Sequence, residues 1–452
     1  MRLFVIWGCL SLMAVVSTVE AQREPNGGVV LRSETIGRNL DRFVAQLLGE
    51  TTTRRREFSD LKREVNQVFF SIPSVMRLIA VEGSLSALVE QAKARKDFQI
   101  QLSVDSGQRS SSTNSDGTIG TQAVTASRPV YDFGAAELGI ERAQAQKRES
   151  LADISEQRSR ALLELILVRL DLNVASQKLG LAQAFYDTRK DFADYIAEKQ
   201  ALGVSSKAEL IRAQAKLFEA EARLPIAFSE LTEAREKFFE LYGYEAPEGI
   251  KFDQPNFDPL RAAEGEIIDM HPLVQLAESR LNAARLELEQ FSAGDSGAFI
   301  FEVTAARVDS PNSDAVSRLD GQITYNRTLG DGGSRDAQKR LLKAGVEEFQ
   351  SAVEQTRRER LRSIRTAKLS LATAESSRAG QLRVLKATRE ANSATKELFM
   401  FNRGNLSDVF RVQEDFLGVA EDVVSAEASV ETAYYELLHE TGSLLRQFEL
   451  SI

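Results

Sequence analysis

The sequence has 452 residues, a net charge of −9 and a pI of about 5.2. Hydrophobic residues make up 43% and charged residues 27%, which excludes a disordered polymer and a protein made of many membrane-spanning helices. An acidic chain lacks the basic surface of a general nucleic-acid binder, so we expect no nucleic acid among its partners. The length suffices for two or three ordinary domains.

The first residues have the pattern of a secretory signal peptide. Arg2 supplies a positive charge, and residues 3–16 are mostly apolar. Val19 and Ala21 are small residues at positions −3 and −1 of a cleavage site after Ala21. We therefore predict a signal peptide over residues 1–21 and an exported mature chain. Two alternatives remain: an uncleaved membrane anchor, which needs a longer apolar run, and a lipoprotein signal ending at Cys9.

Cleavage would remove the only cysteine, Cys9, and the only tryptophan, Trp7. The mature chain would then have no thiol for catalysis, no disulfide and no cysteine to bind a metal. No later window offers 18 uncharged apolar residues. If the mature chain enters a membrane, we expect it to do so as the strands of a closed barrel.

The chain carries an internal repeat with an offset of 199 residues. Three pairs of similar residues share this offset (for example 272 − 73): Pro73 and Pro272, Gly134 and Gly333, and Gln214 and Gln413. Each proline would open a helix, because its fixed φ suits the first turn. Each half is predicted to run helix, strand, polar loop, strand, long helix, glycine break, long helix.

The repeat divides the mature chain into four segments. We predict a first repeat over residues 71–245 and a second over 270–448. The stretch 246–269 is rich in Gly, Pro and Asp and is predicted to be a linker. Residues 22–70 form an N-terminal extension to which the sequence assigns no structure.

Each repeat contains two predicted strands. They lie at about 98–105 and 121–130 in the first repeat and at about 298–308 and 320–329 in the second, with polar surface loops over 106–120 and 310–318. Apolar and polar residues alternate, which gives each strand one apolar face. We expect the following apolar residues to face lipid: Phe98, Ile100, Leu102, Val104, Phe299, Phe301 and Val303. For Phe299 and Phe301, an ordinary protein core is the alternative.

Long helices account for most of each repeat. They are predicted at about 135–200, 206–242, 333–402 and 407–446. Apolar residues between 151 and 196 recur at alternating spacings of three and four, interrupted by Arg158 and Arg189, which indicates coiled-coil packing. A continuous helix over residues 135–200 would be roughly 100 Å long.

Two glycines interrupt the helices at similar places. Gly203 lies in "ALGVSSKAEL" and Gly404 in "NRGNLSDVF". We predict that both end a helix with a positive φ. They are separated by 201 residues (404 − 203), so the two turns are expected to differ in length by two.

The sequence offers no enzyme site. The stretch "LGDGGSR" follows a predicted strand, but Arg335 stands where a dinucleotide loop needs its third glycine. His271 and His439 are far apart, and no Ser/His/Asp set stands out. We therefore predict no catalytic, cofactor-binding or metal residue and no cofactor.

The order of the motifs resembles that of the TolC-like outer-membrane efflux proteins. The similar stretches are "RPVYDFGAAELG", "HPLVQLAESRLNAARLELEQ", "YNRTLGDGG" and "RGNLSDVFRVQEDFL". The resemblance implies a mainly α fold with a membrane β-barrel, in which long antiparallel coiled-coil helices and four strands per protomer close as a trimeric 12-stranded barrel and an α-helical tunnel. It implies a homotrimer in the outer membrane, in contact with its lipid and with a periplasmic adaptor joined to an inner-membrane ABC or RND pump.

The resemblance also implies roles for the residues around the breaks. Adaptor contacts at the periplasmic tip would come from both turns: Leu202, Gly203, Val204, Ser205, Arg403, Gly404, Asn405 and Leu406. The pore constriction would involve the residues that follow them: Glu209, Arg212, Asp408 and Arg411. The family commonly has a second acid three residues after the first, whereas this chain has arginine, so we expect ion pairs rather than purely acidic rings. The alternatives are a helix-terminus role for Asp408 and solvated or intersubunit-paired arginines.

Other functions explain less of the pattern. A coiled-coil structural or adhesive surface protein accounts for the helices but not for the paired strands in both halves. A periplasmic adaptor would need a lipoyl-like β domain, for which the sequence offers no segment.

Overall fold

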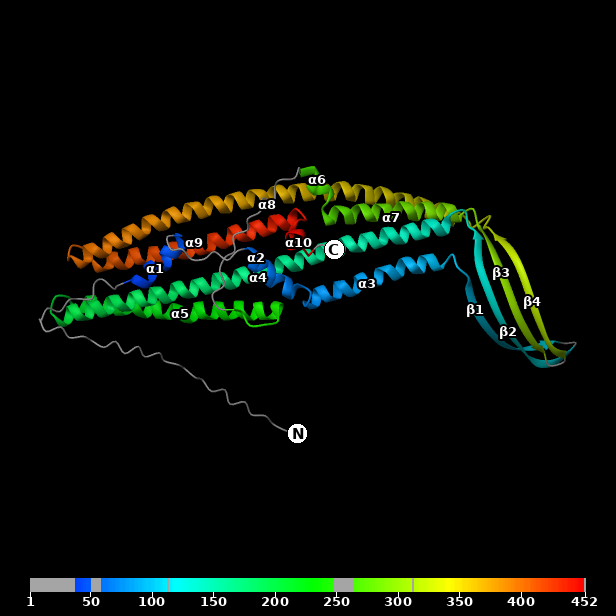
Figure 1. The fold of residues 1–452 in the computed structure, drawn as a ribbon, viewed down its shortest axis with the longest axis horizontal. Helices are drawn as coiled ribbons and strands as arrows, with labels where there is room; N and C mark the ends of the chain where they lie inside the picture. The colour runs from blue at the N-terminus through cyan, green and yellow to red at the C-terminus, as the bar shows by residue number, and fades with distance from the viewer. Residues whose placement is uncertain (1–36, 50–57, 112–113, 248–263, 311–312, 451–452) are drawn as a thin grey trace, which may run out of the picture.

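The computed structural model describes residues 37–49, 58–111, 114–247, 264–310 and 313–450. The predicted signal peptide over 1–21 lies outside these residues. The molecule is elongated, with a shaft of long helices and a curved sheet at one end (Figure 1). We call the opposite end of the shaft the tip.

Two 67-residue helices, α4 (Ala135–Ala201) and α8 (Ser334–Met400), run the whole length of the shaft. On the tip side, α4 packs against α5 (Lys207–Tyr242) and α8 against α9 (Leu406–Glu440). On the sheet side, α3 (Pro73–Ala94) packs against α4, and α7 (Pro272–Gly294) against both α4 and α8. Pro73 and Pro272 occupy the first turns of α3 and α7, as predicted.

Four antiparallel strands form one sheet in the order β1-β2-β3-β4. They are β1 (Gln99–Ser111), β2 (Asn114–Tyr131), β3 (Ala298–Ser310) and β4 (Ser313–Asn326). The predicted loops over 106–120 and 310–318 are wrong, because the ladder continues through most of both stretches. Cross-strand hydrogen bonding overrides the weak strand preference of Ser, Asn and Gly there. The fourth strand also ends earlier than the predicted 320–329.

The sheet has one apolar and one polar face. The register pairs Leu102 with Val124, Val124 with Ala305, and Ala305 with Leu319, so an apolar row crosses all four strands. The next pairs along the strands form the opposite face, where the hydroxyl groups of Thr125 and Thr304 lie 3.1 Å apart. The predicted alternation is therefore present in the middle of the sheet, whereas the next row on the apolar face contains Gln122 and Arg307.

The turn from the sheet into each long helix is repeated. The Asp132 carboxylate accepts hydrogen bonds from the amides of Gly134 (3.1 Å) and Ala136 (2.6 Å). In the second repeat, Asp331 accepts from Gly333 (3.1 Å) and Arg335 (2.7 Å). The stretch that contains Gly333 thus starts a helix after a strand, with an aspartate that satisfies the free amides of the first turn.

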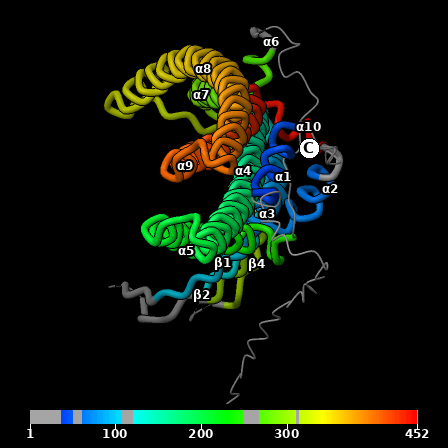
Figure 2. Tube along the Cα trace, turned by 90° about the vertical axis from the view of Figure 1, so that its left-hand side faces the viewer, coloured from blue at the N-terminus to red at the C-terminus, as the bar shows by residue number. Residues whose placement is uncertain are grey.

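The N-terminal extension contributes α1 (Arg38–Leu47) and α2 (Phe58–Phe69). Leu40 and Val44 of α1 pack into a core cluster with residues of α4 and α9. Leu61 and Val65 of α2 belong to a larger cluster with α4, α9 and α10 (Leu444–Gln447). The long helices form a curved layer, and α1, α2 and α10 are all on the same side of it (Figure 2), with α1 nearer the tip (Figure 1). In the predicted linker, α6 spans Glu264–Asp269.

The predicted helix over 407–446 is wrong in its last turns. α9 ends at Glu440, and α10 begins only at Leu444. Gly442 has a φ of 65°, and a Cβ there would lie 2.9 Å from Cδ of Pro272. The break follows because this position needs both the left-handed conformation and the missing side chain of glycine.

Among the described residues, no single helix is long and apolar enough to cross a membrane; the bent pair Leu61–Phe69 and Pro73–Ala94 passes that test together, by length and composition.

Candidate functional site at the helical tip

The two turns at the tip have the same length and an equivalent backbone hydrogen bond. After α4, Gly203 takes a φ of 71° and Val204 N–H donates to Lys199 O (2.9 Å). After α8, the positive φ (54°) belongs to Asn402, and Arg403 N–H donates to Leu398 O (2.9 Å). Asn402 follows Gly203 by 199 residues (402 − 203), so the repeat offset continues through the tip.

The predicted positive φ at Gly404 is therefore wrong, as is the expected two-residue difference between the turns. Asn402 is one of the few non-glycine residue types that tolerate this conformation. Gly404 has a different role, because a Cβ there would lie 3.0 Å from the backbone nitrogen of Phe399. The second turn thus needs a small residue at 404 for close approach of the chain.

A small hydrophobic core lies next to the two turns at the tip. It contains residues of all four helices that meet there: Phe192, Ala193, Tyr195, Ile196, Ala213, Phe399, Leu406, Val409 and Phe410. Leu406, predicted as an adaptor contact, is 1% exposed and is part of this core. Burial thus makes Leu406 a packing residue in the isolated chain.

The other predicted tip residues lie at the surface or partly so. Leu202 is 56% exposed and Val204 61%. Arg403, Gly404 and Asn405 are exposed, and Ser205 is partly buried. Phe401, which was not predicted, is 75% exposed and is the repeat counterpart of Leu202 (401 − 202 = 199). The tip therefore presents apolar side chains from both turns, which is typical of an interaction surface.

Glu209 and Asp408 occupy equivalent positions near the starts of α5 and α9 but make different contacts. Glu209 forms a capping box with Ser206, and the backbone N–H of Ser206, followed by the hydroxyl of Ser205, lowers the pKa of its carboxyl. Asp408 lies 3.5 Å from Arg411, and both side chains are exposed. The predicted Asp408–Arg411 ion pair is present.

Arg212 does not pair with Glu209. Its Nη1 donates a hydrogen bond to Ser407 Oγ in α9 (3.0 Å). The four residues predicted to form the constriction therefore lie close to the tip, and Arg212 links the two hairpins.

A buried arginine joins the same two hairpins further along the shaft. Arg189 of α4 is 1% exposed and donates from Nη1 to Gln413 Oε1 (2.8 Å) and from Nη2 to Glu414 Oε2 (3.3 Å). Glu414 also pairs with Arg223 of α5. The Arg189 guanidinium lies over the ring of Phe185, 4.5 Å from its centroid. Burial lowers the pKa of Arg189 to about 10, against the effect of Glu414, so Arg189 is charged at neutral pH.

The strand residues predicted to face lipid all lie on the apolar face of the sheet. Those of β1 are the most exposed in the isolated chain, with Ile100 at 74% and Leu102 at 68%. Phe301 and Val303 of β3 lie on the same face, paired with Arg128 and Ala126 of β2. Arg128 and Arg307 are charged residues on this face, and the Arg128 guanidinium lies 5.7 Å from the ring centroid of Phe98.

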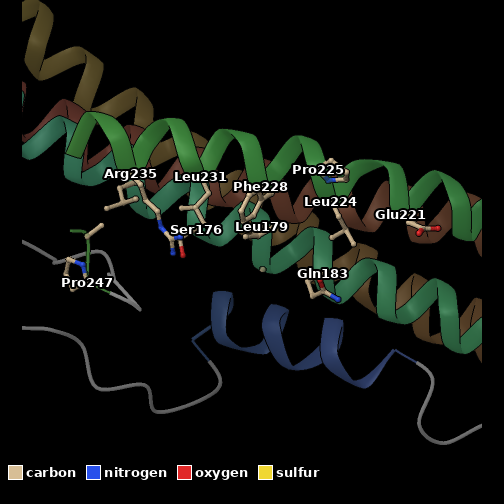
Figure 3. Close-up of a pocket in the computed structure, with 13 residues that line it drawn as sticks. Ser176, Leu179, Gln183, Glu221, Leu224, Pro225, Phe228, Leu231, Arg235 and Pro247 are labelled. Carbon is tan, nitrogen blue, oxygen red and sulfur yellow. The ribbon is translucent and has the colours of Figure 1, made fainter. Parts of the chain in front are cut away.

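A groove with a volume of about 860 Å³ lies between α4 and α5. Figure 3 shows Leu179 of α4 and Leu224 and Phe228 of α5 along it, with Arg235 towards one end. Pro225, inside α5, also lines the groove and cannot donate a helical hydrogen bond. The groove is largely apolar, so it offers packing surface rather than a reactive site.

The described residues include no group of three or more His, Cys, Asp or Glu side chains that could hold a metal ion. His271 Nδ1 accepts the Leu273 N–H (3.1 Å) and so caps α7. His439 Nδ1 lies 2.8 Å from Ser159 Oγ, inside the shaft. These contacts give both histidines a structural role.

The sequence is similar to that of a known bacterial protein. No model of a known protein family matches the sequence. Protein CyaE of Bordetella pertussis is 24% identical over 375 residues, which cover 79% of each chain.

Two solved structures share the fold. A membrane protein from Pseudomonas aeruginosa superposes with a TM-score of 0.74 and 15% identity, over 86% of this chain and 91% of that one. The open state of the MtrE outer-membrane channel of Neisseria gonorrhoeae superposes with a TM-score of 0.72 and 15% identity, over 85% of this chain and 89% of that one. The predicted outer-membrane location agrees with the description of the second structure. The chain thus has the fold of the TolC-like outer-membrane channels, which confirms the resemblance and the fold class predicted from its motifs.

Proposed function

We propose that this protein is the outer-membrane exit duct of a tripartite efflux or type I secretion system. The observation that carries the proposal is the placement of a sheet with one apolar face at one end of a long helical shaft (Figure 1). Such a sheet suits lipid contact, whereas the shaft would extend into the periplasm. The neighbour described as an outer-membrane channel supports this assignment.

The sheet also favours a trimer. β1 and β4 are its edge strands, and unpaired backbone groups at a sheet edge are not tolerated in lipid. Three copies would supply twelve strands and close a barrel wide enough for a channel. In the same assembly the curved helical layers of three protomers would form the wall of a tunnel.

The tip would be the meeting point with the other components. The exposed apolar side chains Leu202, Val204 and Phe401 suit the helical hairpin of a periplasmic adaptor, which would join the duct to an inner-membrane ABC or RND pump. Asp408, Arg411, Glu209 and Arg212 would then surround the entrance. The duct itself would be passive, with the pump supplying energy and selecting drugs or protein as cargo.

Two measurements on the full chain test the proposal. Native mass spectrometry should show a trimer, and planar lipid bilayers should show discrete conductance steps. A soluble monomer without conductance would contradict it. A coiled-coil surface stalk, the rival function, would give no channel openings in the bilayer.

A further inference from the structure

A second cavity is lined by residues of α4, α7 and α10. The start of α7 and α10 lie near each other, midway along the shaft (Figure 1). The volume of the cavity is about 650 Å³, a size that suits small-molecule sites. Pro272 and Gly442, which are in close contact, both line it. One wall comes from α4 and the other from the first turns of α7.

The lining of this cavity is rich in positive charge. Arg148, Arg158 and Arg446 all line it, and they come from α4 and α10. The carboxylate in the lining is Glu278, which Arg357 already holds through a hydrogen bond of 2.6 Å. A chain with a net charge of −9 thus concentrates arginines around one cavity.

Arg158 gives the cavity a fixed donor. Its side chain is 4% exposed, and Nη2 donates to Glu82 Oε2 of α3 over 2.8 Å. Its Nε is buried and has no hydrogen-bond partner among the described residues. A buried donor without a partner costs free energy, and an oxyanion in the cavity would supply the acceptor.

The other two arginines stand at the rim. Arg148 and Arg446 are exposed, and neither forms an ion pair within the part of the chain that the structure describes. Guanidinium groups bind phosphate and carboxylate through paired N–H donors. Both rim residues are therefore available for a ligand that enters from solvent.

Uncharged donors complete the lining. Ser155 of α4 and Ser279 and Asn282 of α7 line the cavity and are partly buried. Ser159 also lines it, but its hydroxyl is engaged by His439. The start of α7 adds the positive end of its dipole, although Pro272 has no amide hydrogen and His271 already accepts the Leu273 N–H.

We propose that this cavity binds a small oxyanion, either a phosphate or a multiply charged carboxylate. Arg158 would hold the anion at the floor, Arg148 and Arg446 would neutralise it at the rim, and the serine hydroxyls would donate the remaining hydrogen bonds. The site lies away from the tip and the sheet, so anion binding here does not depend on the proposed exit-duct function.

Isothermal titration calorimetry on the full chain, purified in detergent in its native assembly, tests the site. The probes are inorganic phosphate and citrate at low ionic strength, with glycerol as a neutral control. Saturable binding of either anion, at one site per chain, is expected, and the stronger binder assigns the chemistry. Glycerol should give no binding heat.

Variants separate the cavity from the general charge of the surface. The double variant R148Q/R446Q should weaken anion binding at least tenfold, and because both residues are exposed it should still fold. Lys147→Gln removes a neighbouring positive charge on α4 that does not line the cavity, and it should change the affinity less than twofold. Wild-type protein that binds neither anion, or Lys147→Gln weakening binding as much as R148Q/R446Q, would overturn the proposal.

Discussion

Lys199 Nζ donates a hydrogen bond to Oδ1 of Asn402 over 2.7 Å and thereby joins the last turn of α4 to the turn that follows α8. The ammonium group also lies 5.3 Å from the ring centroid of Phe399 and 5.5 Å from that of Tyr195. Lys199 is 7% exposed. The contact therefore ties the two hairpins together inside the tip.

The conformation of Asn402 gives the first prediction. Asn402→Gly and Asn402→Ala both remove the acceptor of Lys199, but only glycine takes a positive φ without steric cost. We expect the alanine variant to be less stable than the glycine variant by about 1 kcal/mol. Thermal unfolding of the two proteins measures the difference. Equal stability would mean that the turn does not need the left-handed conformation.

Arg189 is expected to stabilise the junction of α4 and α9. Arg189→Met leaves Gln413, which is 1% exposed, without its donor, and removes a partner of Glu414. Loss of one member of such a buried network should lower the free energy of unfolding by about 3 kcal/mol. Chemical denaturation checks this value. Arg212→Met is the matched control, since Arg212 is exposed and its loss should change stability by less than about 0.5 kcal/mol.

The two faces of the sheet should respond differently to charge. If the apolar face meets lipid, Leu102→Arg should reduce barrel stability by about 2–4 kcal/mol near the middle of the bilayer. Ser103→Arg introduces the same side chain on the polar face and should have a much smaller effect. The yield of heat-resistant trimer in lipid vesicles compares the two variants. Similar losses in both would contradict lipid contact by the apolar face.

The Asp408–Arg411 pair predicts an effect on permeability without one on stability. An exposed ion pair is worth about 0–1 kcal/mol, so Asp408→Ala and Arg411→Ala should both fold normally. If the pair lines a closed entrance, each variant should increase antibiotic leakage into cells. The minimum inhibitory concentration of a large antibiotic measures this leakage. Unchanged permeability in both variants would count against a gate at this position.

His271 predicts loss of stability in acid. Burial is the largest cause that lowers its pKa from 6.5 to about 4, so the unfolded chain binds a proton at a higher pH than the folded chain. The contribution of His271 to the free energy of unfolding is complete above about pH 6.5 and declines as the pH falls towards 4. The loss between pH 7 and pH 5 should be about 2 kcal/mol.

Denaturant titrations at the two pH values measure this loss. His271→Asn keeps a side-chain acceptor for the Leu273 N–H but cannot titrate. Its stability should therefore fall less over the same interval. An identical fall in both proteins would assign the pH dependence to other groups.

Periodicity was enough to predict the long helices, the strands' apolar face and the repeat, because these depend on patterns spread over many residues. The details that the pattern missed depend on single contacts. Asn402 substitutes for a glycine, and Gly442 ends a helix because Pro272, far away in sequence, leaves no room for a side chain. The Ser- and Gly-rich ends of the strands pair only because a partner strand is present.

The partners of buried charged residues were also not predictable from the sequence pattern. Arg158 and Arg189 appeared as interruptions in the apolar repeat, and in the structure each is buried with a carboxylate partner, Glu82 and Glu414 respectively. Those partners lie on other helices, so no local pattern identifies them. An arginine at a core position of a heptad was the signal that could have found them.

The equal length of α4 and α8, 67 residues each, limits how such a shaft can change. The turns of Gly203 and Asn402 are the same number of residues from the sheet in both repeats, so in the proposed trimer the rim that they form would be level. A deletion confined to α4 and α5 would leave one corner of that rim recessed and an adaptor unevenly seated. A seven-residue deletion made in α4, α5, α8 and α9 together would preserve the packing pattern and shorten the shaft by about 10 Å. In the proposed duct, the shaft could therefore be matched to periplasms of different depth in steps of one heptad.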